Sequence, residues 1–182
     1  MGLIVVTGIP GVGKTTVMKK AARGLDINFV TFGTVMIELA QEMKLVKDRD
    51  EMRKLTLEQQ KKLQIKTAER IAKMKNVILD THCTVKTPKG YMPGLPEWVI
   101  KKINPSAIVI VEASPKEIYN RRNKDLTRKR DSDSEEEIDE HQQMNRSIAM
   151  AYAALTGATV KIVFNHNNAI DEAVKQAVLV LR

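Results

Sequence analysis

The residues best suited to chemistry lie near the N-terminus, where a glycine-rich segment leads into a lysine and two threonines. The segment Gly8, Ile9, Pro10, Gly11, Val12, Gly13, Lys14, Thr15 and Thr16 contains the pattern G-x-x-x-x-G-K-[ST]. Glycines allow the backbone to turn several N–H groups toward one compact anion. The pattern predicts a nucleotide site in which Lys14 reaches the β and γ phosphates and the Thr15 hydroxyl holds Mg²⁺.

Asp80 is a second candidate for the metal, because it closes the apolar segment 77–80. Phosphate-loop proteins hold Mg²⁺ or its waters with an aspartate in such a place. An aspartate that only caps a turn is the alternative. The single cysteine, Cys83, excludes an internal disulfide and a cysteine-based zinc site, and only three histidines accompany it.

Cations are concentrated in one segment of a chain whose formal net charge is +8. Between residues 116 and 130 the cations are Lys116, Arg121, Arg122, Lys124, Arg128, Lys129 and Arg130, against the two anions Glu117 and Asp125. Such a block attracts phosphate, either of a nucleotide or of a nucleic-acid backbone. With only three Phe, three Tyr and one Trp, a platform of stacked bases is not expected.

Arginines suit phosphoryl transfer, which requires charge neutralisation and in-line alignment more than covalent chemistry. Bidentate guanidinium contacts supply both. The candidate catalytic residues are Lys14, Arg121, Arg128 and Arg130, and the further arginines proposed to contact substrate are Arg53, Arg122 and Arg146. Taken singly, each arginine is more often a solvated surface residue.

Five apolar segments must position these groups. They are residues 3–6, 28–32, 77–80, 107–112 and 160–164, and helical stretches separate them. Alternation of this kind predicts an α/β fold with a five-stranded parallel sheet and helices on both faces. The continuous Val and Ile content fits strands that are buried on both faces.

The connections between these strands contain several helix signals. A helix is predicted over 34–43, and the capping box Thr56-x-x-Gln59 predicts another to about residue 75, with Ile65, Ala68 and Ala72 on one face. Together they form a helical flap at the carboxyl edge of the sheet, or simply a solvated helical pair. Prolines and glycines in 86–96 predict an ordered loop without helix or strand. Helices are also predicted to begin at Ser114, Ser134 and Asn168, and the second of these to stop at Gly157.

The 182 residues and 43% hydrophobic content suit one domain, 1–182. No apolar run approaches the length of a membrane span, so we expect a cytoplasmic protein that has no membrane contact.

Several uncommon motifs occur together along the chain. They are Gly8 to Thr16, Phe32-Gly33-Thr34, Asp48 to Leu55, Asp80-Thr81-His82, Thr87 to Pro96, Arg121-Arg122, Arg128 to Asp131, and His141 to Arg146. With these motifs the sequence resembles archaeal-type adenylate kinases over nearly its whole length. The resemblance implies reversible transfer of a phosphoryl group between MgATP and AMP to give ADP, a flap over about 34–75 and a short lid over about 124–134. It also implies a homo-oligomer, a trimer.

Two positions depart from the bacterial and animal adenylate kinases. Those enzymes carry arginines where this sequence has Ile37 and Thr84. We expect Arg53 to take the role of the first arginine toward the AMP phosphate, and His82 or Lys86 to take the role of the second. The motif that contains Thr34 adds that residue to the substrate site. Selectivity for AMP over other monophosphates rests on the resemblance.

Two other functions stay open at this point. A related kinase would use a different monophosphate or a hydroxyl acceptor, although the many arginines favour a phosphate. A nucleotide-dependent RNA-binding protein would place 121–130 on a phosphate backbone and show steeply salt-dependent binding. We do not expect nucleic acid to be a partner, and a purely structural module leaves Gly8 to Thr15 unexplained.

Overall fold

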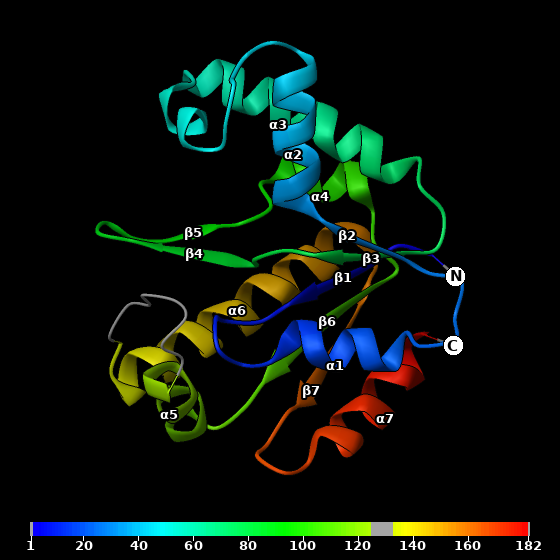
Figure 1. Cartoon of the computed structure of the whole chain (residues 1–182), viewed down its shortest axis with the longest axis vertical. Coiled ribbons are helices and arrows are strands. Elements are labelled where there is room, and N and C mark those ends of the chain that lie inside the picture. The colour runs from blue at the N-terminus through cyan, green and yellow to red at the C-terminus, as the bar shows by residue number, and fades with distance from the viewer. Residues whose placement is uncertain (1, 125–132, 182) are drawn as a thin grey trace.

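A parallel sheet of five strands lies at the centre of the structure, in the order β2-β3-β1-β6-β7 (Figure 1). The computed structural model describes residues 2–124 and 133–181. The strands are β1 Ile4–Thr7, β2 Asn28–Thr31, β3 Val77–Asp80, β6 Ala107–Glu112 and β7 Thr159–Phe164. The predicted fold class is confirmed, and the predicted bounds of β1, β2 and β7 differ by one residue from those observed.

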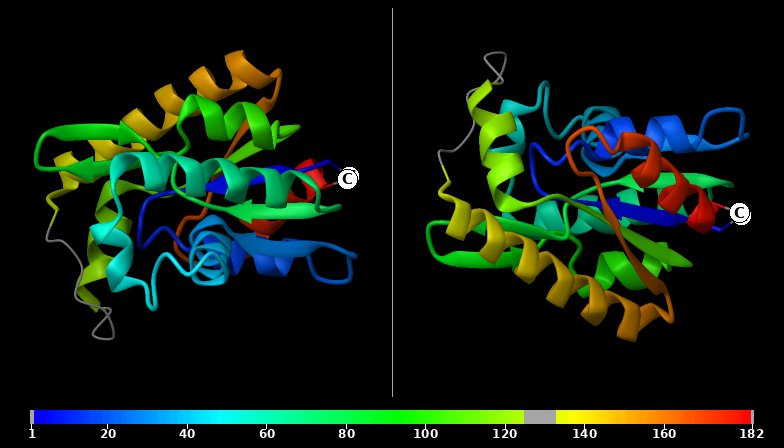
Figure 2. Two further views of the ribbon diagram at one scale, coloured as in Figure 1. Left: turned by 90° about the horizontal axis from the view of Figure 1, so that it is seen from above. Right: turned by 90° about the horizontal axis from the view of Figure 1, so that it is seen from below.

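Helices cover both faces of this sheet. The helices of the described residues are α1 Lys14–Ala21, α2 Phe32–Glu42, α3 Leu57–Ala72, α4 Glu97–Ile103, α5 Pro115–Lys124, α6 Glu135–Thr156 and α7 Ile170–Leu181, with the 3-10 helix η1 Asp50–Lys54. Figure 2 shows α1 and α7 on one face and α4 and α6 on the other. Within the described residues, no helix is long and apolar enough to span a bilayer.

Alternation along the strands explains the two layers of core. Ile4 and Val6 of β1 pack with residues of α1 and α7, whereas Val5 packs with residues of α4 and α6. Because successive side chains of a strand point to opposite faces, one continuous apolar strand supplies both layers. The predicted burial of the strands on both faces is therefore confirmed for β1, β3 and β6. It was wrong for β2 and β7, which are only partly buried because they lie at the edges of the sheet.

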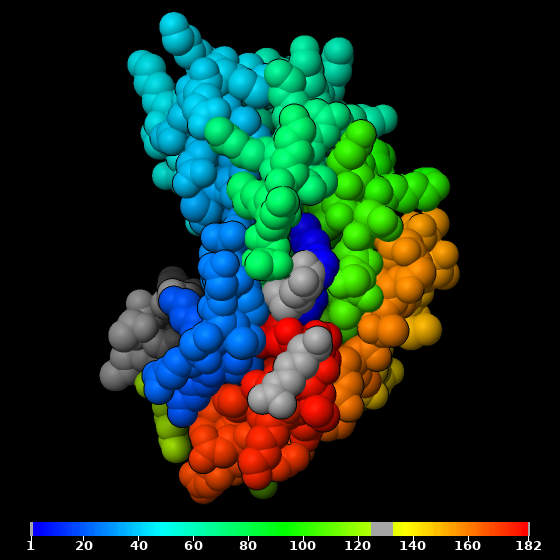
Figure 3. Space-filling view, turned by 90° about the vertical axis from the view of Figure 1, so that its right-hand side faces the viewer, coloured from blue at the N-terminus to red at the C-terminus, as the bar shows by residue number. Residues whose placement is uncertain are grey.

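The flap has a small core of its own. Ala40, Val46, Leu55 and Leu63 form a separate buried cluster under α2, η1 and α3. Figure 3 shows α2 and α3 as an upper lobe, with α1 and α7 below it. The predicted capping box at Thr56 is present.

The buried face of α3 differs from the predicted one. Leu63, Thr67 and Ile71 are buried together with Ala68, whereas the predicted Ala72 is exposed and Ile65 only half-buried. The prediction was wrong for these two residues because α3 packs against both α2 and α4, which selects a different stripe of the helix.

Residues 84–93 correct the prediction of a loop without strand. They form an antiparallel hairpin of β4 Thr84–Thr87 and β5 Gly90–Pro93, in which Val85 is opposite Met92. Pro88 lies in the turn and Pro93 at the end of a two-stranded sheet, where neither has to donate a ladder hydrogen bond. The prolines therefore bound the hairpin and do not prevent it.

The longest helix follows its sequence signals closely. Ser134 and Glu137 form the predicted capping box of α6, and Gly157 ends that helix with a φ of 75°. α5 begins after Ser114 as predicted, whereas α7 begins at Ile170, two residues beyond the predicted Asn168. Short-range capping chemistry is visible in the sequence because all of its partners lie within one helical turn.

Candidate active site

The glycine-rich segment connects β1 to α1 at the carboxyl edge of the sheet. Gly13 has a φ of 86° and is the N-cap of α1, and a Cβ at this position would lie 2.4 Å from Asn165 Nδ2. Any other residue would therefore combine backbone strain with a steric overlap. The loop leads directly into the N-terminus of α1, whose unpaired N–H groups and positive dipole end suit a bound phosphate.

Lys14, Thr15 and Asp80 meet at the mouth of this loop. Parallel pairing places Asp80 of β3 beside Val6 of β1, so the strand register brings the carboxylate to the loop. The Lys14 ammonium forms an ion pair with Asp80 Oδ1, and Thr15 Oγ1 lies 3.4 Å from Asp80 Oδ2. A hydroxyl and a carboxylate side by side are oxygen donors of the kind that Mg²⁺ prefers.

Arg121 supports the backbone of the glycine-rich loop. Its Nη1 lies 3.3 Å from Val12 O, and its Nη2 donates to Asn165 O at 2.8 Å and to Asn167 Oδ1 at 2.7 Å. Asn165 Nδ2 donates to the same Val12 carbonyl at 2.8 Å. Two segments distant in sequence thus fix the backbone of the glycine-rich loop.

Arg122 contacts a different carbonyl of the loop and is 8% exposed. Its Nε donates to Pro10 O at 2.9 Å, and its Nη1 donates to Asp133 Oδ2 at 2.8 Å. The pKa of Asp133 is lowered: burial acts to raise it, but hydrogen bonds from Lys86 and Arg122 outweigh that effect. Asp133 is therefore ionised and neutralises a buried guanidinium.

Lys86 lies on the hairpin against the start of α6. Its Nζ is 3.0 Å from Asp133 Oδ1 and 2.9 Å from Glu137 Oε1. These two carboxylates, first Glu137 and then Asp133, raise the pKa of the lysine. The predicted substrate lysine thus has two anionic partners on the protein itself.

His82 and Thr84 follow Asp80 at the same edge. The pKa of His82 is lowered, chiefly because neighbouring atoms displace part of its hydration and also by the Lys14 charge, against an opposing effect of Asp80. Thr84 is buried and donates to Asn145 Oδ1 at 2.6 Å, so its oxygen accepts from His141 Nε2 at 2.9 Å. The position of the second absent arginine is therefore filled by a hairpin-to-α6 contact.

The remaining predicted substrate residues do not gather at the loop. Arg146 makes a two-point ion pair with the buried Glu112, at 2.8 and 2.5 Å. Arg53 lies on η1 with a side chain that is 86% exposed, and Thr34 is exposed in the first turn of α2. Arg128 and Arg130 lie outside the described residues, as does most of the predicted lid.

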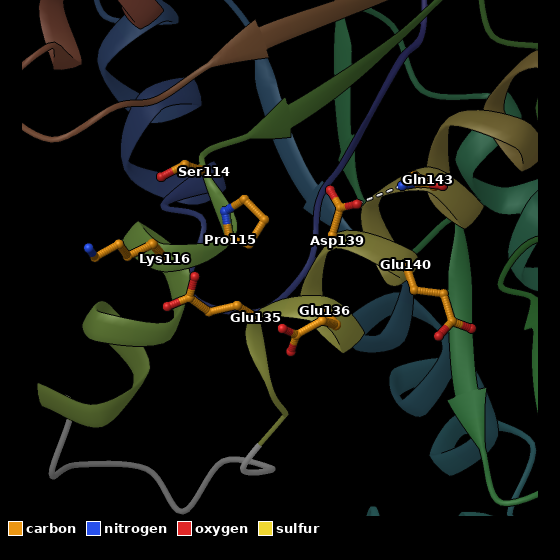
Figure 4. Close-up of a pocket in the computed structure, with 8 residues that line it drawn as sticks. All are labelled: Ser114, Pro115, Lys116, Glu135, Glu136, Asp139, Glu140 and Gln143. Atoms are coloured by element: carbon orange, nitrogen blue, oxygen red, sulfur yellow. Dashed lines mark hydrogen bonds between the residues drawn. The ribbon is translucent and has the colours of Figure 1, made fainter.

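A separate groove of about 460 Å³ lies between the start of α5 and the first turns of α6 (Figure 4). Its lining residues are Ser114, Pro115, Lys116, Glu135, Glu136, Asp139, Glu140 and Gln143. Four carboxylates against one lysine repel phosphate groups, so this groove does not suit a nucleotide. The acidic residues in the first turns of α6 instead stabilise the positive N-terminal end of that helix.

Comparison with known proteins gives the family. The chain is 53% identical to an adenylate kinase of Methanopyrus kandleri over 99% of this chain and 97% of that protein. It is 52% identical to an adenylate kinase of Methanothermobacter thermautotrophicus over the full length of both. The chain belongs to the adenylate kinase family.

Broader comparisons agree with the fold. A family model described as an AAA domain matches residues 7–139. The crystal structure of a shikimate kinase from Bacteroides thetaiotaomicron is similar with a TM-score of 0.61 at 17% identity, over 99% of this chain and 98% of that one. A shikimate kinase from Acinetobacter baumannii gives a TM-score of 0.59, covering 100% of this chain and 93% of that one, also at 17% identity. At such low identity the likeness shows the fold alone.

Two polar residues of this adenylate kinase-family site escaped the sequence analysis. Asn165 directly follows β7, as a polar residue at the carboxyl edge of a strand, so the argument that was made for Asp80 applies to it as well. Asp133 lies in the predicted lid, directly before the helix start predicted at Ser134, and no role was predicted for it. No local pattern around Asp133 indicates its contacts with Lys86 and Arg122, which lie 47 and 11 residues away.

Proposed function

We propose that the chain catalyses the reversible, Mg²⁺-dependent transfer of a phosphoryl group from ATP to AMP, giving two ADP, and so balances adenine nucleotides. The observation that carries this proposal is the meeting of Lys14, Thr15 and Asp80 at the glycine-rich loop. The full-length similarity to adenylate kinases supports AMP as the acceptor.

In this proposal the donor nucleotide lies on the loop Gly8 to Thr16. Backbone N–H groups and the N-terminus of α1 receive its phosphates, and Lys14 exchanges its Asp80 partner for phosphate oxygens. Thr15 and Asp80 hold Mg²⁺, directly or through water, and the ion neutralises charge on the phosphates when bound. Arg121 and Arg122 keep the loop in shape and border the transferred group.

The acceptor needs no strong base. The second phosphate pKa of a nucleoside monophosphate lies near 6, so AMP is already an anionic nucleophile at neutral pH. The obstacle is repulsion between two anions, which cations relieve. Thr34, Arg53 and His82 are the acceptor-side residues that we retain, and Arg128 and Arg130 are our candidates to close over the transferred phosphoryl group.

Two predicted acceptor residues take a different role in the proposal. The Lys86 ammonium already contacts two carboxylates, and the Arg146 guanidinium is paired with a buried one. Releasing Arg146 would leave Glu112 as an uncompensated buried charge, which is costly. We therefore assign Lys86 and Arg146 to holding the structure around the site and not to AMP.

The proposal also includes the one-domain organisation, with segment 34–75 as the AMP-side flap and 124–134 as the lid. Closing both would exclude water, so that ATP is not hydrolysed in place of transfer. A cytoplasmic location and a homotrimer complete it, on the family resemblance. Cell fractionation and light scattering on the purified protein test these two points.

A steady-state assay tests the function directly. ADP formation from MgATP is measured with AMP, CMP, UMP, GMP or no acceptor, with and without chelation of Mg²⁺, beside Lys14→Ala. Fast turnover confined to AMP, dependent on Mg²⁺ and lost in the variant is the expected result. Turnover with another acceptor would change the substrate and keep the mechanism. No stimulation by any monophosphate would refute the nucleoside monophosphate kinase function.

A further inference from the structure

Asp133 is the point where the two sides of the site meet. Its Oδ2 accepts from Arg122, whose Nε is bonded to Pro10 of the glycine-rich loop, and its Oδ1 accepts from Lys86 of the hairpin. The Asp133 and Arg122 side chains are 13% and 7% exposed. One carboxylate thus bridges the donor-side loop and the hairpin that follows Asp80.

The contact with Arg122 is stronger than a surface ion pair. A buried guanidinium without a counter-charge is costly, and a carboxylate at hydrogen-bond distance both neutralises and orients it. Since a guanidinium carries five N–H donors, its bonds to Pro10 and Asp133 fix its plane without exhausting those donors. The geometry leaves Arg122 suited to contact an oxyanion at the loop.

The neighbouring Glu137 offers an internal comparison. It also contacts Lys86, at 2.9 Å, but its other contact is with Ser134 in the capping box of α6 and not with Arg122. Asp133 and Glu137 therefore share the hairpin lysine, and Asp133 adds the arginine.

We propose that Asp133 is a positioning residue for phosphoryl transfer, which acts by holding the Arg122 guanidinium against Pro10 of the phosphate loop. This inference rests on the proposed adenylate kinase function. Substitution of Asp133 should lower the rate of transfer more than the binding of either nucleotide, because an arginine that acts on charge developing during transfer affects kcat. Arg122 should account for the whole effect.

The experiment compares Asp133→Asn, Glu137→Gln, Arg122→Gln and the double variant D133N/R122Q in the ADP-forming assay. We expect D133N to lower kcat about tenfold, with KM for MgATP and AMP changed less than about threefold. E137Q retains the capping-box acceptor and should stay near the wild-type rate. The double variant should be no slower than R122Q, because effects that share one route do not add.

Other results would overturn the proposal. They are wild-type kcat in D133N, a lowered KM for MgATP that would make Asp133 a competitor of the nucleotide for Arg122, or a double variant in which the two losses multiply. If D133N does not fold, as judged by thermal melting beside E137Q, Asp133→Glu serves in its place. We expect D133E to retain kcat within about threefold, because it keeps the negative charge. A tenfold loss of kcat in D133E that multiplies with the loss in R122Q would contradict the inference. A wild type without AMP-dependent turnover would instead refute the function itself.

Discussion

The phosphate loop and the flap hold their arginines in opposite ways. Arg121 and Arg122 donate to the backbone carbonyls of Val12 and Pro10. On the flap, by contrast, the Arg53 side chain is 86% exposed and lies 3.6 Å from an equally exposed Asp50. A surface pair of this kind contributes about 0–1 kcal/mol, so it hardly restrains the side chain.

The difference indicates how the two sides would work. Arg121 and Arg122 are fixed by contacts within the protein itself, which in the proposed mechanism would reduce the reorganisation that transfer requires. The flap exposes its charged side chains to solvent and has a small core of its own, while Phe32, Val35, Ala68 and Ile71 of α2 and α3 also join the main core. In the proposed mechanism its exposed arginine would be ordered only when AMP binds. Changes at the loop should therefore alter kcat, and changes on the flap should alter the KM for AMP.

The largest effect is expected from Lys14→Ala, which removes the cation at the mouth of the loop. We expect kcat to fall about a thousandfold, because a charged donor to the transferred phosphoryl group is lost. Steady-state ADP formation measures it. Lys19→Ala, an exposed lysine of the same helix, is the control. A loss of less than tenfold in Lys14→Ala would contradict a rigid, charge-based donor site.

Gly13→Ala tests the shape of the loop, with Gly24→Ala as its match. Both glycines have positive φ, 86° and 79°, but a Cβ at Gly24 meets nothing within 4 Å. Gly24→Ala should cost only the backbone strain, about 1 kcal/mol by thermal or denaturant unfolding. Gly13→Ala adds the overlap with Asn165, and kcat/KM for MgATP should fall about a hundredfold. Equal behaviour of both variants would show that the loop adapts easily.

Arg53→Ala examines the flap side of the comparison. We expect KM for AMP to rise about tenfold while kcat and KM for MgATP stay within about twofold, because the residue contributes binding energy only. Lys54→Ala, on the same 3-10 helix and paired with Glu51, is the control. An unchanged KM for AMP in Arg53→Ala would remove this residue from the site.

Glu117→Gln gives the smallest effect and concerns the support of the donor side. Glu117 accepts from Asn167 N and His166 Nδ1, and Asn167 in turn bonds Arg121. Burial acts to raise the pKa of Glu117, but the bonds from Asn167, His166 and Ser114 lower it to about 2.

A carboxylate whose pKa is lowered by folding stabilises the folded protein at any pH above its pKa in the unfolded chain. This stabilisation is lost as the pH falls toward the folded-state pKa of about 2. Glu117→Gln should therefore lower the free energy of unfolding by about 1 kcal/mol at pH 7, measured by denaturant unfolding. This difference should shrink progressively as the pH falls below about 4.5. Glu97→Gln, whose pKa is lowered by the exposed Lys101, is the control and should change stability little. A pH-independent difference for Glu117→Gln would contradict the ionic origin.

Much of the donor side was visible in the sequence because its signals are local. The loop motif, the aspartate that ends β3 and the capping boxes at Thr56 and Ser134 each depend on spacings of a few residues or on one strand pattern. The hairpin is also local, but its prolines and glycines predict a loop. They are compatible with two strands because Pro88 lies in the turn and Pro93 at the end of the hairpin.

By itself the sequence determined the five strands, the phosphate loop with Lys14 and Thr15, and the placement of Asp80 at the same edge. Only the tertiary structure decided which charges meet. Arg146 is paired with Glu112, Lys86 and Arg122 share Asp133, and Thr84 bonds α6 in place of an arginine. A strand or a loop follows from neighbouring residues, whereas an ion pair follows from the packing of helices that the chain brings together from a distance.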